Sequence, residues 1–105
     1  MKKYLIILIF VTAYVTHYTK ESSCHYPKNG RCLTASGKIA TANLTAACPR
    51  KYKFGTKIKI DDKVYECQDR LNKKYDDRFD LFTDESLKEA FKWGKQQKQI
   101  ELLTN

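Results

Sequence analysis

Apolar and polar residues alternate along several short segments of the chain, which is typical of strands with one buried face. Residues 54–60 (FGTKIKI) place two isoleucines on one face and two lysines on the other. Asp61 and Asp62 then provide a two-residue turn, and residues 63–67 return as the partner strand. The pattern therefore predicts a half-buried hairpin in the middle of the chain.

Three further runs are rich in β-branched, aromatic or alternating apolar residues and predict short strands. They are residues 15–18 (VTHY), 79–82 (FDLF) and 99–103 (QIELL). Between residues 20 and 37 the chain is rich in turn formers, including an Asn-Gly pair at 29–30 and a Thr-Ala-Ser-Gly segment at 34–37. These segments predict loops.

One helix is predicted from about Glu85 to Trp93. Thr83 or Asp84 is its expected N-cap, and Gly94 is expected to end it. The i, i+3, i+4 spacing gives it one apolar face, made of Leu87, Ala90 and Phe91. With about six short strands, one helix and no internal repeat, the predicted fold is mainly β, a small six-stranded barrel with one covering helix.

The first residues resemble an export signal. A basic start at residues 1–3 precedes an apolar run at 4–11, and Val11 and Ala13 are small residues at the positions that a signal peptidase reads. A membrane-spanning helix needs about 20 apolar residues, whereas here polar residues begin at Thr12. We expect residues 1–13 to be a signal peptide or a membrane anchor and residues 14–105 to be the domain. A buried first strand or helix of a cytosolic protein is the alternative.

Length and charge narrow the class of protein. The chain has 105 residues, enough for one small domain, and 42 % hydrophobic residues exclude a structureless tail. Removal of Lys2 and Lys3 lowers the formal net charge from +8 to +6, so the basicity belongs to the domain. Basic composition alone is a weak sign of nucleic-acid binding, because lysines that alternate along a strand edge also block edge pairing. No nucleic acid is expected as a partner.

Four cysteines in an exported chain favour two disulfides over free thiols. The successive cysteines are separated by 7, 15 and 18 residues, which contain no C-x-x-C pair and argue against a zinc site. Cys24 and Cys32 flank the turn at 29–30, so a bridge between them would close it. His17 and His25 are lone histidines, and neither a metal nor another cofactor is expected.

Two aspartates stand apart from the other acids. Asp69 directly follows the predicted hairpin, and Asp80 lies between Phe79 and Leu81, where an ionised carboxylate is costly unless it is paired or functional. Such an aspartate is a candidate general acid with a raised pKa. The alternative is that Asp80 simply points outward, because alternate strand residues face opposite sides.

From about Val15 to Leu103 the chain resembles the three-aspartate (3D) domains of bacterial and phage cell-wall proteins, which adopt a double-psi β-barrel. The motifs that carry this resemblance are residues 15–18 (VTHY), 34–37 (TASG), 46–49 (AACP), 54–56 (FGT), Asp69-Arg70 eleven residues before Asp80, and 89–94 (EAFKWG).

The resemblance implies an activity on peptidoglycan glycan strands. Family members include lytic transglycosylases, which cleave between N-acetylmuramic acid and N-acetylglucosamine without water and leave a 1,6-anhydro sugar. Asp80 matches the acid that protonates the glycosidic oxygen, and Asp69 matches a second acid. The residues implied to bind sugar are Thr34, Ser36, Arg70, Asn72 and Tyr75.

One departure from the family is serious, because its first aspartate is replaced by Cys48 before Pro49. A glycine pair that usually follows the second aspartate is also replaced, by residues 71–72. A bridge between Cys48 and Cys67 is the simplest account of both cysteines, and a thiol nucleophile beside His17 is the rival account.

The resulting expectation is a monomeric, exported protein, secreted or anchored at the cell envelope, that cleaves glycan strands. A non-catalytic wall-binding barrel is the alternative. Attraction of the basic domain to anionic wall polymers would need nothing more specific than charge.

Overall fold

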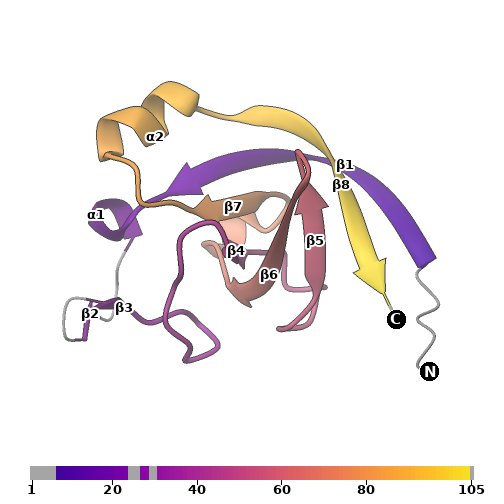
Figure 1. The fold of residues 1–105 in the computed structure, drawn as a ribbon, viewed down its shortest axis with the longest axis horizontal. Coiled ribbons are helices and arrows are strands. Elements are labelled where there is room, and N and C mark those ends of the chain that lie inside the picture. The colour runs from indigo at the N-terminus through magenta and orange to yellow at the C-terminus, as the bar shows by residue number, and fades with distance from the viewer. Residues whose placement is uncertain (1–6, 24–26, 29–30, 105) are drawn as a thin grey trace.

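The computed structural model describes residues 7–23, 27–28 and 31–104 (Figure 1). The strands are β1 (Ile7–Tyr18), β2 (Pro27–Lys28), β3 (Arg31–Cys32), β4 (Thr45–Ala47), β5 (Lys57–Ile60), β6 (Lys63–Asp69), β7 (Phe79–Phe82) and β8 (Gln96–Thr104). The helices are α1 (Lys20–Ser23), α2 (Leu87–Trp93) and a 3-10 turn, η1 (Lys73–Tyr75). The expected mainly β fold is confirmed. Among the described residues, no helix is long and apolar enough to cross a membrane.

Six strands close a barrel in the order β1-β7-β4-β6-β5-β8. The pairs β1–β7 and β4–β6 are parallel, and the other pairs are antiparallel. β7 is inserted between the consecutive barrel strands β1 and β4, and β4 is inserted between the consecutive strands β6 and β7. Along the chain, the barrel strands are β1, β4 and β5 followed by β6, β7 and β8. If each strand of the first set is exchanged with the corresponding strand of the second set, the same closed order results. This is the double-psi arrangement. Its two inserted strands, β4 and β7, are paired with each other.

The predicted hairpin is confirmed as β5 and β6. Asp61 and Asp62 have φ angles of 49° and 65°, the left-handed pair that a two-residue hairpin turn requires. Ile58 and Ile60 are buried, as their alternation predicted.

Strands β1 and β8 are longer than predicted and run side by side as an antiparallel ribbon (Figure 1). Their register extends from Ile7 opposite Thr104 to Val15 opposite Gln96. Val11 and Ala13 pack against the core. Residues 7–13, which belong to the segment expected to be a signal peptide or a membrane anchor, thus form the first seven residues of β1.

Helix α2 begins at Leu87, and its N-cap is Ser86 rather than Thr83 or Asp84. The Ser86 hydroxyl accepts a bond from the Glu89 amide (3.1 Å), and the Glu89 carboxylate accepts one from the Ser86 amide (3.2 Å), so a capping box fixes the start. The helix ends at Gly94 as predicted, with φ at 72°. Phe91 is 75 % exposed, so its predicted place on the apolar face is wrong. Ala90 and Trp93 make up the packed side instead.

The barrel interior is filled by alternate residues of its strands. The buried side chains of this cluster are Val15, Ala46, Cys48, Ile58, Ile60, Tyr65, Cys67, Phe79, Leu81, Ile100 and Leu102. Burial of these large apolar side chains supplies most of the favourable free energy of folding. Residues on the outer side of the central strands are therefore available for other roles.

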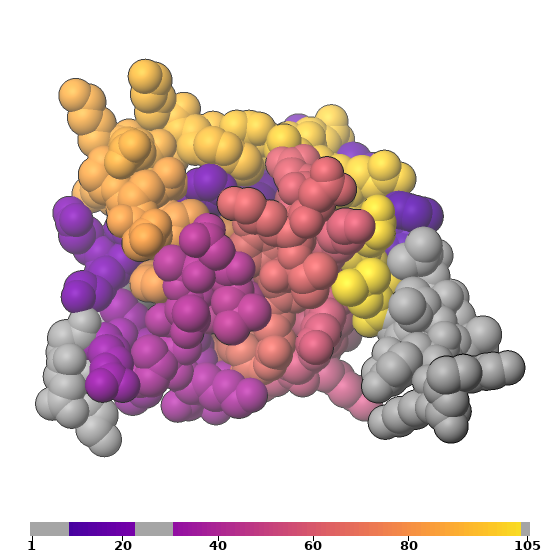
Figure 2. Space-filling view, viewed as in Figure 1, coloured from indigo at the N-terminus to yellow at the C-terminus, as the bar shows by residue number. Residues whose placement is uncertain are grey.

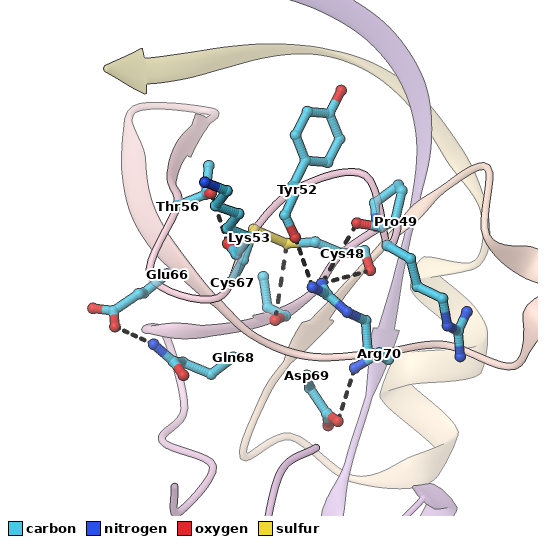
Figure 3. The surroundings of a disulfide bond; sticks show 12 residues. Cys48, Pro49, Tyr52, Lys53, Thr56, Glu66, Cys67, Gln68, Asp69 and Arg70 are labelled. Carbon is cyan, nitrogen blue, oxygen red and sulfur yellow. Dashed lines mark hydrogen bonds between the residues drawn. A yellow bond between two sulfur atoms is a disulfide. The ribbon is translucent and has the colours of Figure 1, made fainter. Parts of the chain in front are cut away.

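The predicted Cys48–Cys67 disulfide is confirmed, with a Cα–Cα distance of 5.6 Å, and both residues are fully buried (Figure 3). It joins the end of β4 to β6. The Cys48 amide also donates to the Asp69 carbonyl (3.1 Å). The rival account of Cys48 as a free thiol is wrong, because its sulfur is bonded to Cys67. In the other predicted bridge, Cys32 is buried, whereas Cys24 lies outside the described residues.

Replacement of both Cys48 and Cys67 by alanine should lower the free energy of unfolding by about 3 kcal/mol, the chain-entropy value for a loop of this size. Urea denaturation of the two proteins measures the difference. Val64→Ala, at an exposed site of β6, is the control and should change stability by less than about 0.5 kcal/mol. A loss below 1 kcal/mol in the double variant would contradict a structural role for the bridge.

A chain that begins at Tyr14 should be less stable than the full chain by about 2 kcal/mol, because Val11 and Ala13 leave the core. Seven of the nine residue pairs between β1 and β8 are lost as well. Thermal and urea unfolding of the two purified proteins test this expectation. Equal stability would instead support residues 14–105 as the complete folding unit.

Candidate functional site

Asp69 and Asp80 lie in one row across the centre of the barrel. Ala47 of β4 is paired with Asp80 of β7 on one side and with Asp69 of β6 on the other. Thr16 of β1 continues the row beyond Asp80. Because neighbouring strands are about 4.8 Å apart, the two aspartate Cα atoms are separated by roughly 10 Å. The double-psi order thus brings together two acids from strands that are not neighbours.

An irregularity in the register of β4 and β6 selects which acid is brought there. Ala46 is opposite Cys67, but the next residue, Ala47, is opposite Asp69, so Gln68 is skipped. Such a bulge changes the residue presented at a strand end. Without it, Gln68 would stand opposite Ala47.

Asp80 points away from the core, as the alternation of Phe79 and Leu81 requires, but its outer side is not open surface. It lines a groove of about 420 Å³. The groove is lined by Tyr18, Leu33, Ala35, Ala47, Asp69, Arg70, Leu71, Asn72, Tyr75 and Asp80. The outward orientation and the candidate functional role of Asp80 are therefore compatible.

The segment between β3 and β4 supplies part of the groove lining and lies beside β6 on one face of the molecule (Figure 2). The Ser36 amide donates to the Gln68 carbonyl (3.1 Å), and the Glu66 amide donates to the Leu44 carbonyl (2.7 Å). These bonds hold the segment against the strand that ends in Asp69.

Both carboxylate oxygens of Asp69 accept hydrogen bonds. Tyr18 donates its hydroxyl to Oδ2 (2.8 Å), and the amides of Ala35 and Arg70 donate to Oδ1 (3.0 and 2.9 Å). Burial and the nearby charge of Asp69 raise the pKa of Tyr18, so this hydroxyl stays protonated and remains a donor. The three donors fix the orientation of the Asp69 carboxylate.

Asp80 has fewer partners. Thr16 donates its hydroxyl to Oδ1 of Asp80 (2.8 Å). Burial raises the pKa of Asp80 to about 6, and the charge of Asp69 adds to the rise, while the Thr16 bond and the charge of Arg78 oppose it. Asp80 is therefore half protonated near pH 6, which suits a carboxyl group that donates a proton.

Of the residues implied to bind sugar, Arg70, Asn72 and Tyr75 line the groove. The Arg70 guanidinium, however, donates to backbone carbonyls of the chain after β4, including that of Tyr52 (2.6 Å; Figure 3). It also lies over the ring of Phe54. Arg70 therefore fastens that chain segment. Asn72 caps η1 through its side-chain oxygen, which accepts from the Lys74 amide (3.2 Å).

Thr34 and Ser36 are not among the residues that line the groove. Their hydroxyls lie 2.9 Å apart, and Thr34 also donates to the Lys38 carbonyl (2.9 Å). The two side chains thus stabilise the turn that begins at Thr34. The residues of this loop that line the groove are Leu33 and Ala35.

Sequence reasoning missed Thr16, Tyr18 and Ala47. The period-2 pattern of a strand places Thr16 and Tyr18 on one face, which is the face that meets the two aspartates. This pattern was present in the sequence, but the local sequence did not show which strands would lie beside β1. Cys48, which the sequence resemblance matches to the first aspartate of three-aspartate domains, is buried in the disulfide, so it contributes no acid to the groove.

His17 takes part in a separate contact. Its Nδ1 lies 2.7 Å from the Glu85 carboxylate, and its ring stacks on Trp93 with the centroids 3.8 Å apart. Across the part of the chain that the structure describes, no group of three or more His, Cys, Asp or Glu residues is arranged to hold a metal ion.

No protein-family model matches this chain, and a search of curated proteins found no match. The fold and the site therefore define the class directly: a disulfide-linked double-psi β-barrel whose central strands carry two aspartates in one groove.

Asp80→Asn should flatten the pH dependence of stability. Because the folded-state pKa is raised from 3.8 to about 6, the carboxyl stabilises the fold below about pH 4, and this contribution is lost as pH rises through 6. Relative to the wild type, the variant should gain about 2 to 3 kcal/mol between pH 4 and pH 7.5. Urea denaturation at both pH values gives the difference. Asp62→Asn, in the exposed turn, should show no such gain.

Proposed function

We propose that this protein is an exported, peptidoglycan-active member of the three-aspartate class and cleaves glycan strands by a lytic transglycosylase-type reaction. The observation that carries the proposal is the placement of Asp69 and Asp80 in one groove, with a pKa of about 6 at Asp80. The sequence motifs described above and the double-psi order support it. The buried disulfide fits an oxidising compartment.

The first step needs a protonated acid. Asp80 donates its proton to the glycosidic oxygen as the bond to the anomeric carbon breaks, and positive charge develops on the sugar. Asp69, held by three donors on the far side of Ala47, stabilises this charge electrostatically. The small Ala47 side chain leaves the space between the two carboxylates open to the sugar.

The second step uses the same carboxyl group as a base. The 6-hydroxyl of the sugar attacks the anomeric carbon, and Asp80, now ionised, accepts its proton. The products are a 1,6-anhydro sugar and a free hydroxyl on the leaving strand, so no water is consumed. Asp80 ends the cycle protonated, which explains why one acid suffices.

A glycan-binding barrel without cleavage is the second candidate. The observation that favours it is the loss of the third acid, since the sulfur of Cys48 is bonded to Cys67 in the core. A groove that retains Asp69 and the exposed ring of Tyr75 can still hold sugar by hydrogen bonds and apolar contact.

Purified protein incubated with peptidoglycan sacculi should release muropeptides with 1,6-anhydro ends, measured by mass spectrometry. The rate should fall about tenfold per pH unit above pH 6, because only the protonated form of Asp80 starts the reaction. Asp80→Asn should reduce the rate at least about 100-fold, the usual effect of losing a general acid.

Asp62→Asn is the matched control and should keep the wild-type rate. Sacculi that retain the protein in a pull-down but release nothing soluble would reject cleavage and favour the binding barrel. Wild-type rates in Asp80→Asn would reject the assigned role of Asp80.

A further inference from the structure

Two cations meet at one tyrosine on the edge of the groove. Tyr75 lines the groove and is 40 % exposed. The Cζ atom of Arg78 lies 4.7 Å from its ring centroid, and the Nζ atom of Lys74 lies 5.0 Å from it. The ring therefore acts as a support that holds two positive charges near the groove mouth.

The terminal nitrogens of Arg78 remain available for a ligand. Its Nε donates to the exposed Asp77 carboxylate (3.2 Å), and within the described residues neither terminal nitrogen has a hydrogen-bond partner. Lys74 likewise forms no ion pair with any described residue. Arg50, by contrast, is fully engaged with Asp76 and a backbone carbonyl.

Arg78 immediately precedes β7 and is two positions from Asp80. Its guanidinium lies over Tyr75, and Tyr75 lines the groove together with Asp80. Although burial raises the pKa of Asp80, the charge of Arg78 opposes that rise, which indicates that the guanidinium acts on the acid. A group that neutralises Arg78 would therefore change the charge that acts on the reacting carboxyl.

We propose that Arg78, supported by Tyr75 and accompanied by Lys74, binds a carboxylate of the glycan, so that the groove selects acidic glycan strands over neutral ones. This inference rests on the proposed function. An arginine fork matches a carboxylate with two parallel hydrogen bonds, which a lysine does not provide. Where the stem peptide has been removed, muramic acid carries such a group on the lactyl ether at C3, on the same sugar ring whose C1 bond would be cleaved.

The bound carboxylate has a second consequence for Asp80. By neutralising Arg78 it removes the charge that favours the ionised form of Asp80, so the proton needed in the first step is retained. Arg78 is in this respect a positioning residue that links recognition of the substrate to protonation of the acid.

The test uses glycan strands freed of peptide by an amidase, which leaves the lactyl carboxylates free, and the same strands amidated with carbodiimide and ammonia. Binding is measured by calorimetry in the Asp80→Asn background, which prevents cleavage. We expect amidated strands to bind roughly fivefold to tenfold more weakly. Arg78→Gln should weaken binding of the acidic strands by the same factor and leave the amidated strands unaffected.

Lys63→Gln, at the exposed start of β6, removes one charge elsewhere and should change neither affinity. Arg78→Lys should restore only part of the preference, because the fork is lost. Circular dichroism checks that each variant folds. If Arg78→Gln does not fold, the inference is still tested by whether the groove with Arg78 intact binds acidic strands more tightly than amidated strands.

Equal binding of the two glycans, or equal weakening of both by Arg78→Gln, would overturn the inference. Cleavage is scored separately with the wild type. If acidic and amidated strands are cut at equal rates, the carboxylate site fails while the proposed function stands. If binding discriminates but neither strand is cut, cleavage fails and the carboxylate site stands.

Discussion

The insertion of β4 between β7 and β6 is the constraint on which the other features depend. Because β4 pairs with both neighbours, its two alanines are fixed in position, with Ala46 facing the core and Ala47 facing the groove. Both side chains are small, which suits Ala46 to the packed core and Ala47 to the open groove. A bulky residue at Ala47 would fill the space between Asp69 and Asp80. The register shift beside Ala47 then places Asp69, rather than Gln68, in the groove.

Different contacts stabilise the inner and outer sides of the site around β4. The Cys48–Cys67 disulfide and the Arg70 guanidinium hold the chain on the inner side of the site, while Tyr18 and the Ala35 amide hold the Asp69 carboxylate on the outer side. The Asp80 carboxyl group has only the hydroxyl of Thr16 as a hydrogen-bond partner among the described residues, and its burial favours the protonated form. The difference between the two acids thus comes from their partners and burial, because their chemistry is the same.

The apolar N-terminal run shows how one pattern fits two structures. A signal segment and a strand that packs one face on a core can both be short apolar stretches. Residues 7–13 fit the first description in sequence and the second in the fold, where Val11 and Ala13 pack against the core while Ile9 and Phe10 are exposed. The same ambiguity affects α2. Its spacing allowed Phe91 on the packed face, but a two-turn helix docks through only a few residues, and Ala90 and Trp93 make the contact.

The sequence by itself determined the local elements: the hairpin with its Asp61-Asp62 turn, the end of the helix at Gly94, and the alternation that buries Phe79 and Leu81. It also singled out Asp80, because an acid among apolar residues is costly, and Asp69, because it directly follows the hairpin. Only the tertiary structure decided that Ala47 stands between them, that Thr16 and Tyr18 bind them, and that Arg70, Thr34 and Ser36 support the chain. The physical reason is that period-2 patterns fix which side a residue faces, whereas strand order and register are set by non-local pairing.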